Sequence, residues 1–250
     1  MIEYKSGERL GYIKKSPHSL ECVSSIKRIE KGLFMSESVL NFLEEKNLPE
    51  VTKKKHTYLM MDGHDQEDIY VLKDGVVKVS IVLCDGREFN ITYLKGLDMI
   101  SLLKDEINKM TTASFHARIE SDTATFYRIN RKLFEQYVKE NEELQVYIDS
   151  YYRKKMTEAI YRQQLMTMNG KNGAVCAFIY HLIPLFGRQV KKGVFIDLQI
   201  TNDDIANFCG VSTRNSVNRI LRGLREENVI TMVYHKILIL DVDYLKRYVQ

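Results

Sequence analysis

Arginine and asparagine gather in one short run near the carboxyl end of the chain. Residues 212–225 hold four Arg, two Asn and no acidic residue. Arginine can donate two hydrogen bonds to guanine, asparagine can bond adenine in the same way, and hydroxyl groups can donate to phosphate oxygens. The run therefore has the chemistry to bind DNA. The side chains that we predict to contact DNA are Ser212, Thr213, Arg214, Asn215, Ser216, Asn218, Arg219 and Arg222.

Two short helices are predicted to position these side chains. Thr201 or Asn202 can cap the first helix, Gly210 ends it, and Ser212 or Thr213 can cap the second. The second helix has apolar residues at the i, i+3, i+4 and i+7 positions, namely Val217, Ile220, Leu221 and Leu224. A hairpin pattern follows over residues 230–240. The arrangement predicts a winged helix-turn-helix, and the alternative is a solvated basic face on an ordinary helical hairpin.

The middle of the chain has a different texture. After a predicted helix at 38–45, short β-branched and aromatic runs alternate with turn residues from about residue 57 to residue 129. Asp74-Gly75 and Asp85-Gly86 are typical of type I′ hairpin turns, so they predict a meander of antiparallel strands. About eight strands fit, enough for a small jelly roll or barrel.

One long helix is predicted between the β region and the basic domain. Residues 131–168 contain no Gly or Pro, and apolar residues recur in them at helical spacing: Leu144, Ile148, Tyr151, Tyr152, Met156, Ala159, Ile160, Leu165 and Met166. We favour a dimerisation helix, as in a coiled coil, over a helix packed within one domain. Residues 169–173 are predicted to end it as a C-cap and hinge. A further helix at 174–186 and a strand at 194–198 follow.

Several motifs resemble the Crp/Fnr family of bacterial transcription regulators. They are Asp204-Ile205-Ala206, Gly210-Val211-Ser212, Val217-Asn218-Arg219-Ile220-Leu221 and 224–230, and the resemblance extends over about residues 36–250. The segments 70–75, 93–96 and 243–248 resemble the PrfA-like branch of Gram-positive pathogens. Two departures leave the target sequence open: Asn215 stands where the family often has Glu, and one extra residue separates Gly210 from Val217.

The resemblance implies an α+β fold with three parts. These are a jelly-roll β-roll similar to cyclic-nucleotide-binding domains (35–130), a dimerisation helix region (131–169) and a winged helix-turn-helix (170–250). An N-terminal extension of unknown role (1–34) lies outside the resemblance. It also implies a homodimer on double-stranded DNA with a palindromic operator, and it makes RNA polymerase a candidate partner. Met35 could be the true start of the chain.

An effector of the β-roll is open to two interpretations. By resemblance, a small peptide or a glutathione-like molecule would lie near Tyr93, Lys95, Tyr147, Tyr151 and Tyr152. The alternative is that these side chains only pack. Cyclic AMP is not expected, because residues 96–103 have no Glu for the ribose and no Arg-Ser pair for the phosphate. An iron–sulfur cluster is not expected either, because only Cys22 of the four cysteines lies near the N-terminus.

Composition limits the other classes of function. The net charge of +4 lies wholly in residues 169–250, which hold 11 basic and 7 acidic residues. The sequence has no transmembrane stretch or signal peptide, so we expect a cytoplasmic protein without a membrane partner. His56 and His64 lack nearby ligand partners, so we predict no metal site, no catalytic residue and no enzyme, against the alternative of a metal-dependent jelly-roll enzyme. Cys209 is the thiol to test for redox sensitivity.

Overall fold

The computed structural model describes residues 37–60, 67–102 and 114–249. The predicted N-terminal extension, Met35, Cys22 and His64 lie outside these residues, as do residues 103–113, the first of which ends the stretch tested for a cyclic-nucleotide motif. Helix α2 spans Glu37–Glu45, as predicted. In the described residues no helix is long and apolar enough to span a membrane.

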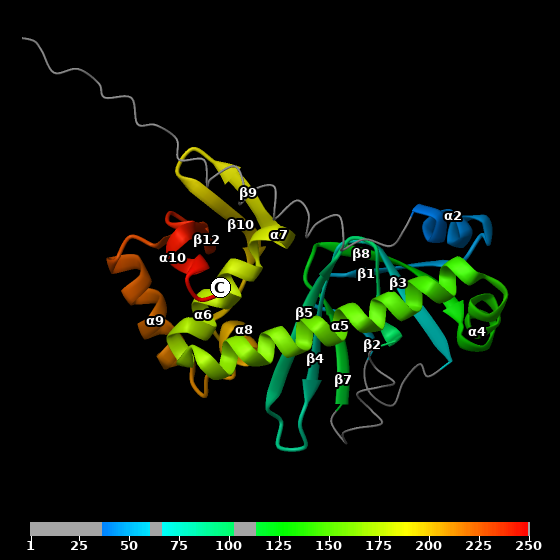
Figure 1. Ribbon diagram of the computed structural model, residues 1–250, viewed down its shortest axis with the longest axis horizontal. Coiled ribbons are helices and arrows are strands. Elements are labelled where there is room, and N and C mark those ends of the chain that lie inside the picture. The colour runs from blue at the N-terminus through cyan, green and yellow to red at the C-terminus, as the bar shows by residue number, and fades with distance from the viewer. Residues whose placement is uncertain (1–36, 61–66, 103–113, 250) are drawn as a thin grey trace, which may run out of the picture. The chain divides into compact units, whose positions relative to one another are not determined.

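Two four-stranded antiparallel sheets form the β-roll (Figure 1). One has the order β1-β8-β3-β6, with bounds Glu50–Lys54, Thr123–Asn130, Asp68–Asp74 and Asp98–Met99. The other has the order β2-β7-β4-β5, with bounds Tyr58–Met60, Ser114–Ile119, Val76–Val82 and Glu88–Lys95. Fully buried side chains of both sheets, such as Leu72, Phe126, Val77 and Phe115, form one core cluster. This is the predicted jelly-roll class of fold.

The predicted meander is wrong at its first turn. Asp74-Gly75 joins β3 to β4, but these strands pair in different sheets, so the turn is a crossing between sheets. Gly75 has φ +110°, and a Cβ there would lie 2.6 Å from the Cβ of Ala124. The glycine thus permits a close approach of two strands. The second turn does join a hairpin, β4 with β5, although Gly86 has a positive φ and Asp85 does not.

The predicted helix at 131–168 is interrupted once. Helix α4 spans Arg131–Glu140 and α5 spans Glu142–Met168, with Asn141 extended between them at φ −125°. The Asn141 side chain accepts a hydrogen bond from the backbone N–H of Leu144 at 2.8 Å, so it caps α5 and starts a new helix. The prediction of one continuous helix was wrong, because the Asn141 side chain takes a backbone N–H that would otherwise bond a helical carbonyl.

The predicted hinge is also shorter than expected. Asn169 ends α5, and Gly170, at φ +60°, already begins α6 (Gly170–His181). Gly173 lies inside that helix and is buried against Tyr248. A separate short helix, α7 (Ile183–Phe186), has Pro184 in its first turn, so the predicted helix at 174–186 consists of two pieces.

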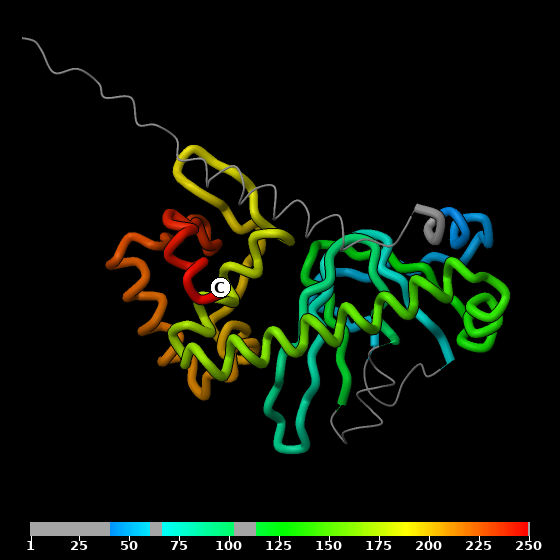
Figure 2. The backbone as a smooth tube through the Cα atoms, viewed as in Figure 1, coloured from blue at the N-terminus to red at the C-terminus, as the bar shows by residue number. Residues whose placement is uncertain are grey.

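The carboxyl-terminal part has a third four-stranded sheet, with helices against it. Its order is β11-β12-β10-β9, with bounds Ile230–Val233, Lys236–Ile239, Gly193–Gln199 and Gly187–Val190. Strand β9, absent from the sequence prediction, pairs with β10 in the yellow hairpin of Figure 2. Helices α8 (Asn202–Cys209), α9 (Arg214–Glu226) and α10 (Val242–Lys246) complete it.

Helix α5 has one apolar face that packs and one that does not. Leu144 and Tyr151 are buried with Val71 and Met99 in a second core cluster. On another face Met156 and Ile160 are 63% and 57% exposed. The predicted apolar stripe therefore divides between packing within the chain and an uncovered surface.

Candidate nucleic-acid interface

Helix α8 begins with a reciprocal cap. The Thr201 hydroxyl accepts a hydrogen bond from the backbone N–H of Asp204 at 3.0 Å, and the Asp204 carboxylate accepts one from the backbone N–H of Thr201 at 3.2 Å. This capping box satisfies two backbone donors at the helix start. Of the two predicted caps, Thr201 and Asn202, it is therefore Thr201 that caps the helix. Gly210 ends the helix in the left-handed conformation at φ +61°.

A second cap starts α9 three residues later. Thr213 is extended, and its hydroxyl accepts a hydrogen bond from the backbone N–H of Ser216 at 3.2 Å. Val217, Leu221 and Leu224 are buried, so they hold one face of α9 against the rest of the domain. This gives the predicted pair of helices with a tight turn, in which the opposite face of the second helix is free.

The predicted DNA-contacting residues lie together, six of them on the polar face of α9 and Ser212 and Thr213 directly before it. Seven of the eight are exposed and the eighth, Ser216, is partly buried; the exposed residues are Ser212, Thr213, Arg214, Asn215, Asn218, Arg219 and Arg222. Their donors are available for base edges and phosphate oxygens, and the first turn of α9 has no acidic residue to oppose a phosphate.

Two of these side chains already have partners on α8. The Arg214 guanidinium lies 3.8 Å from the Asp203 carboxylate, and Asn218 accepts a hydrogen bond from the Asn202 amide. Both contacts lie at the exposed junction of the two helices. They orient Arg214 and Asn218 in the chain without DNA, and such exposed contacts cost little to exchange.

A hairpin follows α9 in the position of a wing. Strands β11 and β12 pair in register from Ile230↔Ile239 to Val233↔Lys236. Tyr234 and His235 form the turn between them, both with positive φ and both exposed. Two left-handed residues are what a two-residue type I′ turn requires.

The five side chains predicted to hold an effector lie in two groups. Tyr93 is buried against Phe186 and Phe208, and burial raises its pKa. Lys95 donates to the backbone carbonyl of Leu185 at 2.8 Å. These contacts join β5 to α7 and α8.

The other group lies along α5. The Tyr151 ring lies against the rings of both Tyr147 and Tyr152. Its hydroxyl donates to the backbone carbonyl of Met99 at 2.9 Å. Burial raises the pKa of Tyr147 and of Tyr151. Tyr151 belongs to the core cluster of α5 and the β1-β8-β3-β6 sheet, and the partly buried Tyr147 and Tyr152 pack against it.

One further charged residue was missed by sequence reasoning. Lys78 on β4 is 1% exposed, and it forms ion pairs with Glu88 and with Asp204 of α8. Its position between Val77 and Val79 gave an ordinary alternating pattern, in which a lysine would face solvent. In the folded chain its ammonium lies between Asp204 of α8 and Glu88 of β5. Within residues 37–60, 67–102 and 114–249, no group of three or more His, Cys, Asp and Glu side chains could hold a metal ion.

Comparisons with known proteins agree with this geometry. A family model described as a Crp-like helix-turn-helix domain matches residues 173–248, which include α8, α9 and the wing. A lactate racemization regulatory protein of Lactiplantibacillus plantarum is 54% identical over 209 residues, 84% of this chain and 95% of that protein. The listeriolysin regulatory protein of Listeria monocytogenes is 24% identical over 215 residues, 85% of this chain and 90% of that protein.

The fold has counterparts among solved structures. A CooA mutant from Carboxydothermus hydrogenoformans superposes with a TM-score of 0.66 at 17% identity, covering 84% of this chain and 90% of that one. At that identity the likeness concerns the fold, and it includes both the β-roll and the helix-turn-helix.

Proposed function

Because the chain belongs to the Crp/Fnr family of transcription regulators, we propose that it binds one palindromic class of DNA site as a homodimer. The observation that carries this proposal is the free polar face of α9. Arginines and asparagines are exposed there above a buried apolar face, at the helix that enters the major groove in this class of motif.

We assign different roles to the side chains of that face. Arg214 and Arg219 bond base edges, with Asn215 assisting, because their donors are exposed and suited to bidentate contacts. Ser212 and Ser216 bond phosphate oxygens near the start of α9, where the helix dipole also favours an anion. The phosphate contacts set the register, and the arginines supply the sequence preference.

The dimer is supported by the uncovered face of α5. Met156 and Ile160 are separated by one helical turn, and Val146 and Met168 extend the same helix with 56% and 74% exposure. A second copy of α5 would bury these side chains in a coiled-coil contact. Such a dimer has twofold symmetry, so its two α9 helices would read half-sites about 34–36 Å apart.

Selection from random DNA duplexes tests the proposal. The full-length protein should enrich an inverted repeat whose half-sites are centred about one helical turn apart. Its affinity for that duplex should exceed its affinity for a scrambled duplex by at least about a thousandfold. Equal binding to both duplexes would contradict sequence-specific regulation, and enrichment of a single half-site would contradict the dimer.

The target genes and the effector are finer parts of the proposal. The 54% identical relative is named for lactate racemization, which supports a test of DNA upstream of lactate racemase genes. The PrfA-like placement is supported by similarity to the listeriolysin regulator. We propose an effector that is not cyclic AMP. Thermal shifts with reduced glutathione, short peptides, D-lactate, L-lactate and cyclic AMP test this, and stabilisation by cyclic AMP alone would contradict it.

A further inference from the structure

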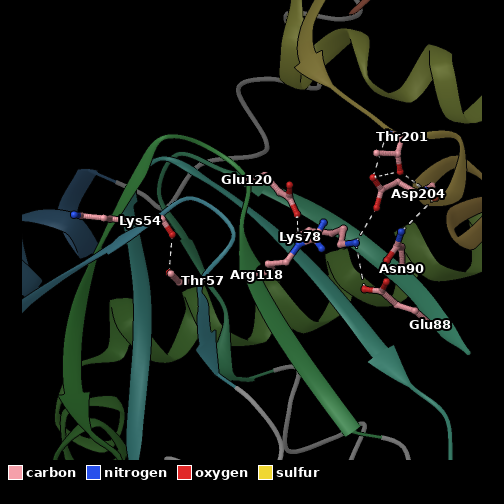
Figure 3. A network of polar contacts seen from close by, with 9 residues as sticks. All are labelled: Lys54, Thr57, Lys78, Glu88, Asn90, Arg118, Glu120, Thr201 and Asp204. Carbon is pink, nitrogen blue, oxygen red and sulfur yellow. Dashed lines mark hydrogen bonds and ion pairs between the residues drawn. The ribbon is translucent and has the colours of Figure 1, made fainter. Parts of the chain in front are cut away.

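A lysine is buried where the β-roll contacts the helix-turn-helix. Lys78 lies in the middle of β4, and its side chain is 1% exposed. Its ammonium donates to Asp204 Oδ1 at 2.8 Å and lies 3.2 Å from Glu88 Oε1 (Figure 3). Lysine is seldom fully buried without a charged partner, so these two carboxylates account for its position.

Asp204 connects this lysine to the start of α8. Its Oδ1 accepts from Lys78, and its Oδ2 accepts from the Thr201 hydroxyl at 2.6 Å and from the Thr201 backbone N–H. Burial raises the pKa of Asp204, but the hydrogen bonds from Lys78 and Thr201 outweigh it and leave the pKa below its usual range. One carboxylate thus caps the helix and attaches it to β4.

The neighbouring strand contacts both ends of the same helix. Asn90 of β5 is fully buried, and its amide donates to the backbone carbonyl of Asp204 at 3.2 Å. At the last turn of α8, the Phe208 ring lies 4.8 Å from the Tyr93 ring, centroid to centroid. Helix α8 is therefore held on the β4–β5 hairpin by polar contacts at its first turn and by an aromatic contact at its last.

These contacts leave the DNA-contacting face free. They involve Asp204 and Phe208, which are buried, whereas Arg214, Arg219 and Arg222 of α9 remain exposed. The arrangement in which Lys78 binds Asp204 is therefore compatible with DNA binding.

We propose that Lys78 is a positioning residue for DNA binding, which holds α8 on the β-roll so that the two α9 helices of a dimer keep the separation of a palindromic site. This inference rests on the proposed DNA-binding function. If the contact is lost, the helix-turn-helix samples several orientations, and apparent affinity falls in proportion to the fraction that fits both half-sites. A single half-site places no demand on the separation.

The Lys78→Met variant of the full-length protein tests this with two duplexes. One carries the complete palindrome selected by the wild type, and the other carries one intact half-site and one scrambled half-site. We expect affinity for the palindrome to fall about tenfold or more, with affinity for the half-site changing less than about twofold. The matched control is Lys73→Met, because Lys73 pairs with Glu50 on the surface of the β-roll.

A double variant separates positioning from folding. Lys78→Met leaves the Asp204 carboxylate buried without its cation, so it lowers the melting temperature. Lys78→Met with Asp204→Asn removes both charges of the most buried pair and leaves only Glu88, whose side chain is 30% exposed to water, and an asparagine oxygen can still accept from Thr201. We expect the double variant to regain the melting temperature of the wild type but to keep the low ratio of palindrome to half-site affinity.

Each result has one meaning. The positioning role would be overturned if Lys78→Met kept the wild-type ratio of palindrome to half-site affinity, lost affinity equally for both duplexes, or bound the palindrome more tightly. It would also be overturned if the double variant regained the wild-type ratio. A wild type that does not prefer the palindrome over the half-site would overturn the proposed homodimer itself, and with it this inference.

Discussion

Asp203 of α8 and Arg214 of α9 face each other across the turn of the helix-turn-helix, with carboxylate and guanidinium 3.8 Å apart. Both side chains are more than half exposed, so the pair contributes at most about 1 kcal/mol. A bidentate contact with a base is worth more, about 1–3 kcal/mol of discrimination. Arg214 is therefore oriented before DNA binds and is free to exchange its partner.

Replacing Arg214 by alanine tests that role. We expect a loss of about 1–3 kcal/mol in binding to the selected site and relaxed preference at one base-pair position, measured with a panel of single-substitution duplexes. Arg87→Ala is the control, because Arg87 also pairs with an exposed aspartate but lies on the β4–β5 turn. An equal loss on all duplexes would instead make Arg214 a phosphate contact.

The uncovered face of α5 gives a second prediction. Met156→Glu together with Ile160→Glu should shift the protein from dimer to monomer in sedimentation velocity, because four carboxylates would meet in the twofold contact. Binding to the palindrome should fall with it. Val190→Glu is the control, because Val190 is 44% exposed on β9, away from α5. A dimer that survives the double change would place the interface elsewhere.

The elements of the DNA-binding part could be predicted because their signals are local. The caps at Thr201 and Thr213 and the left-handed Gly210 each act within one helical turn, and the apolar spacing from Val217 to Leu224 extends over only two. The β-roll was harder, because Asp74-Gly75 has the composition of a hairpin turn and only long-range pairing shows that it joins two sheets. Strand pairing depends on contacts far apart in sequence.

The contacts that join the parts could not be predicted. Lys78 and Asp204 are 126 residues apart, and neither has a local signal for the other. The break at Asn141 was missed although its cap is local, because an asparagine in a helical pattern can either continue the helix or accept from the backbone N–H three residues on. Sequence patterns thus identified the elements, and the packing between them decided which polar residues are buried.

Cys209 provides a third prediction. Burial raises the pKa of the Cys209 thiol to about 12 and that of the Cys176 thiol to about 12. At pH 7 only roughly one molecule in 10⁵ would carry a Cys209 thiolate, the form that reacts with peroxide or iodoacetamide. We expect Cys84, which is exposed, to be alkylated in the folded protein before either buried thiol, as measured by peptide mass spectrometry.

DNA binding should therefore resist mild oxidation. In both the wild type and Cys209→Ser, affinity for the selected duplex should be the same before and after brief peroxide treatment. A loss of binding in the wild type that Cys209→Ser prevents would contradict the inert thiol and would make Cys209 a redox switch.

His181 at the end of α6 gives a dependence of stability on pH. Burial, with the nearby positive charge of Arg162, lowers the pKa of His181 to about 4. In the unfolded chain its pKa is about 6.5, so between these values the unfolded state binds more protons than the folded state. The contribution of His181 to the free energy of unfolding is complete above pH 6.5 and declines as the pH falls toward 4.

Urea unfolding at a series of pH values between 4 and 7.5 measures this dependence. His181→Gln should flatten the slope over that range, because glutamine does not titrate, although it also loses the edge contact with the Tyr161 ring. His235→Gln is the matched control, because His235 is exposed at the turn of the wing and should leave the slope unchanged. A slope that persists in His181→Gln would assign the acid sensitivity to other groups, of which Asp204 is not one, because its lowered pKa places its titration below this pH range.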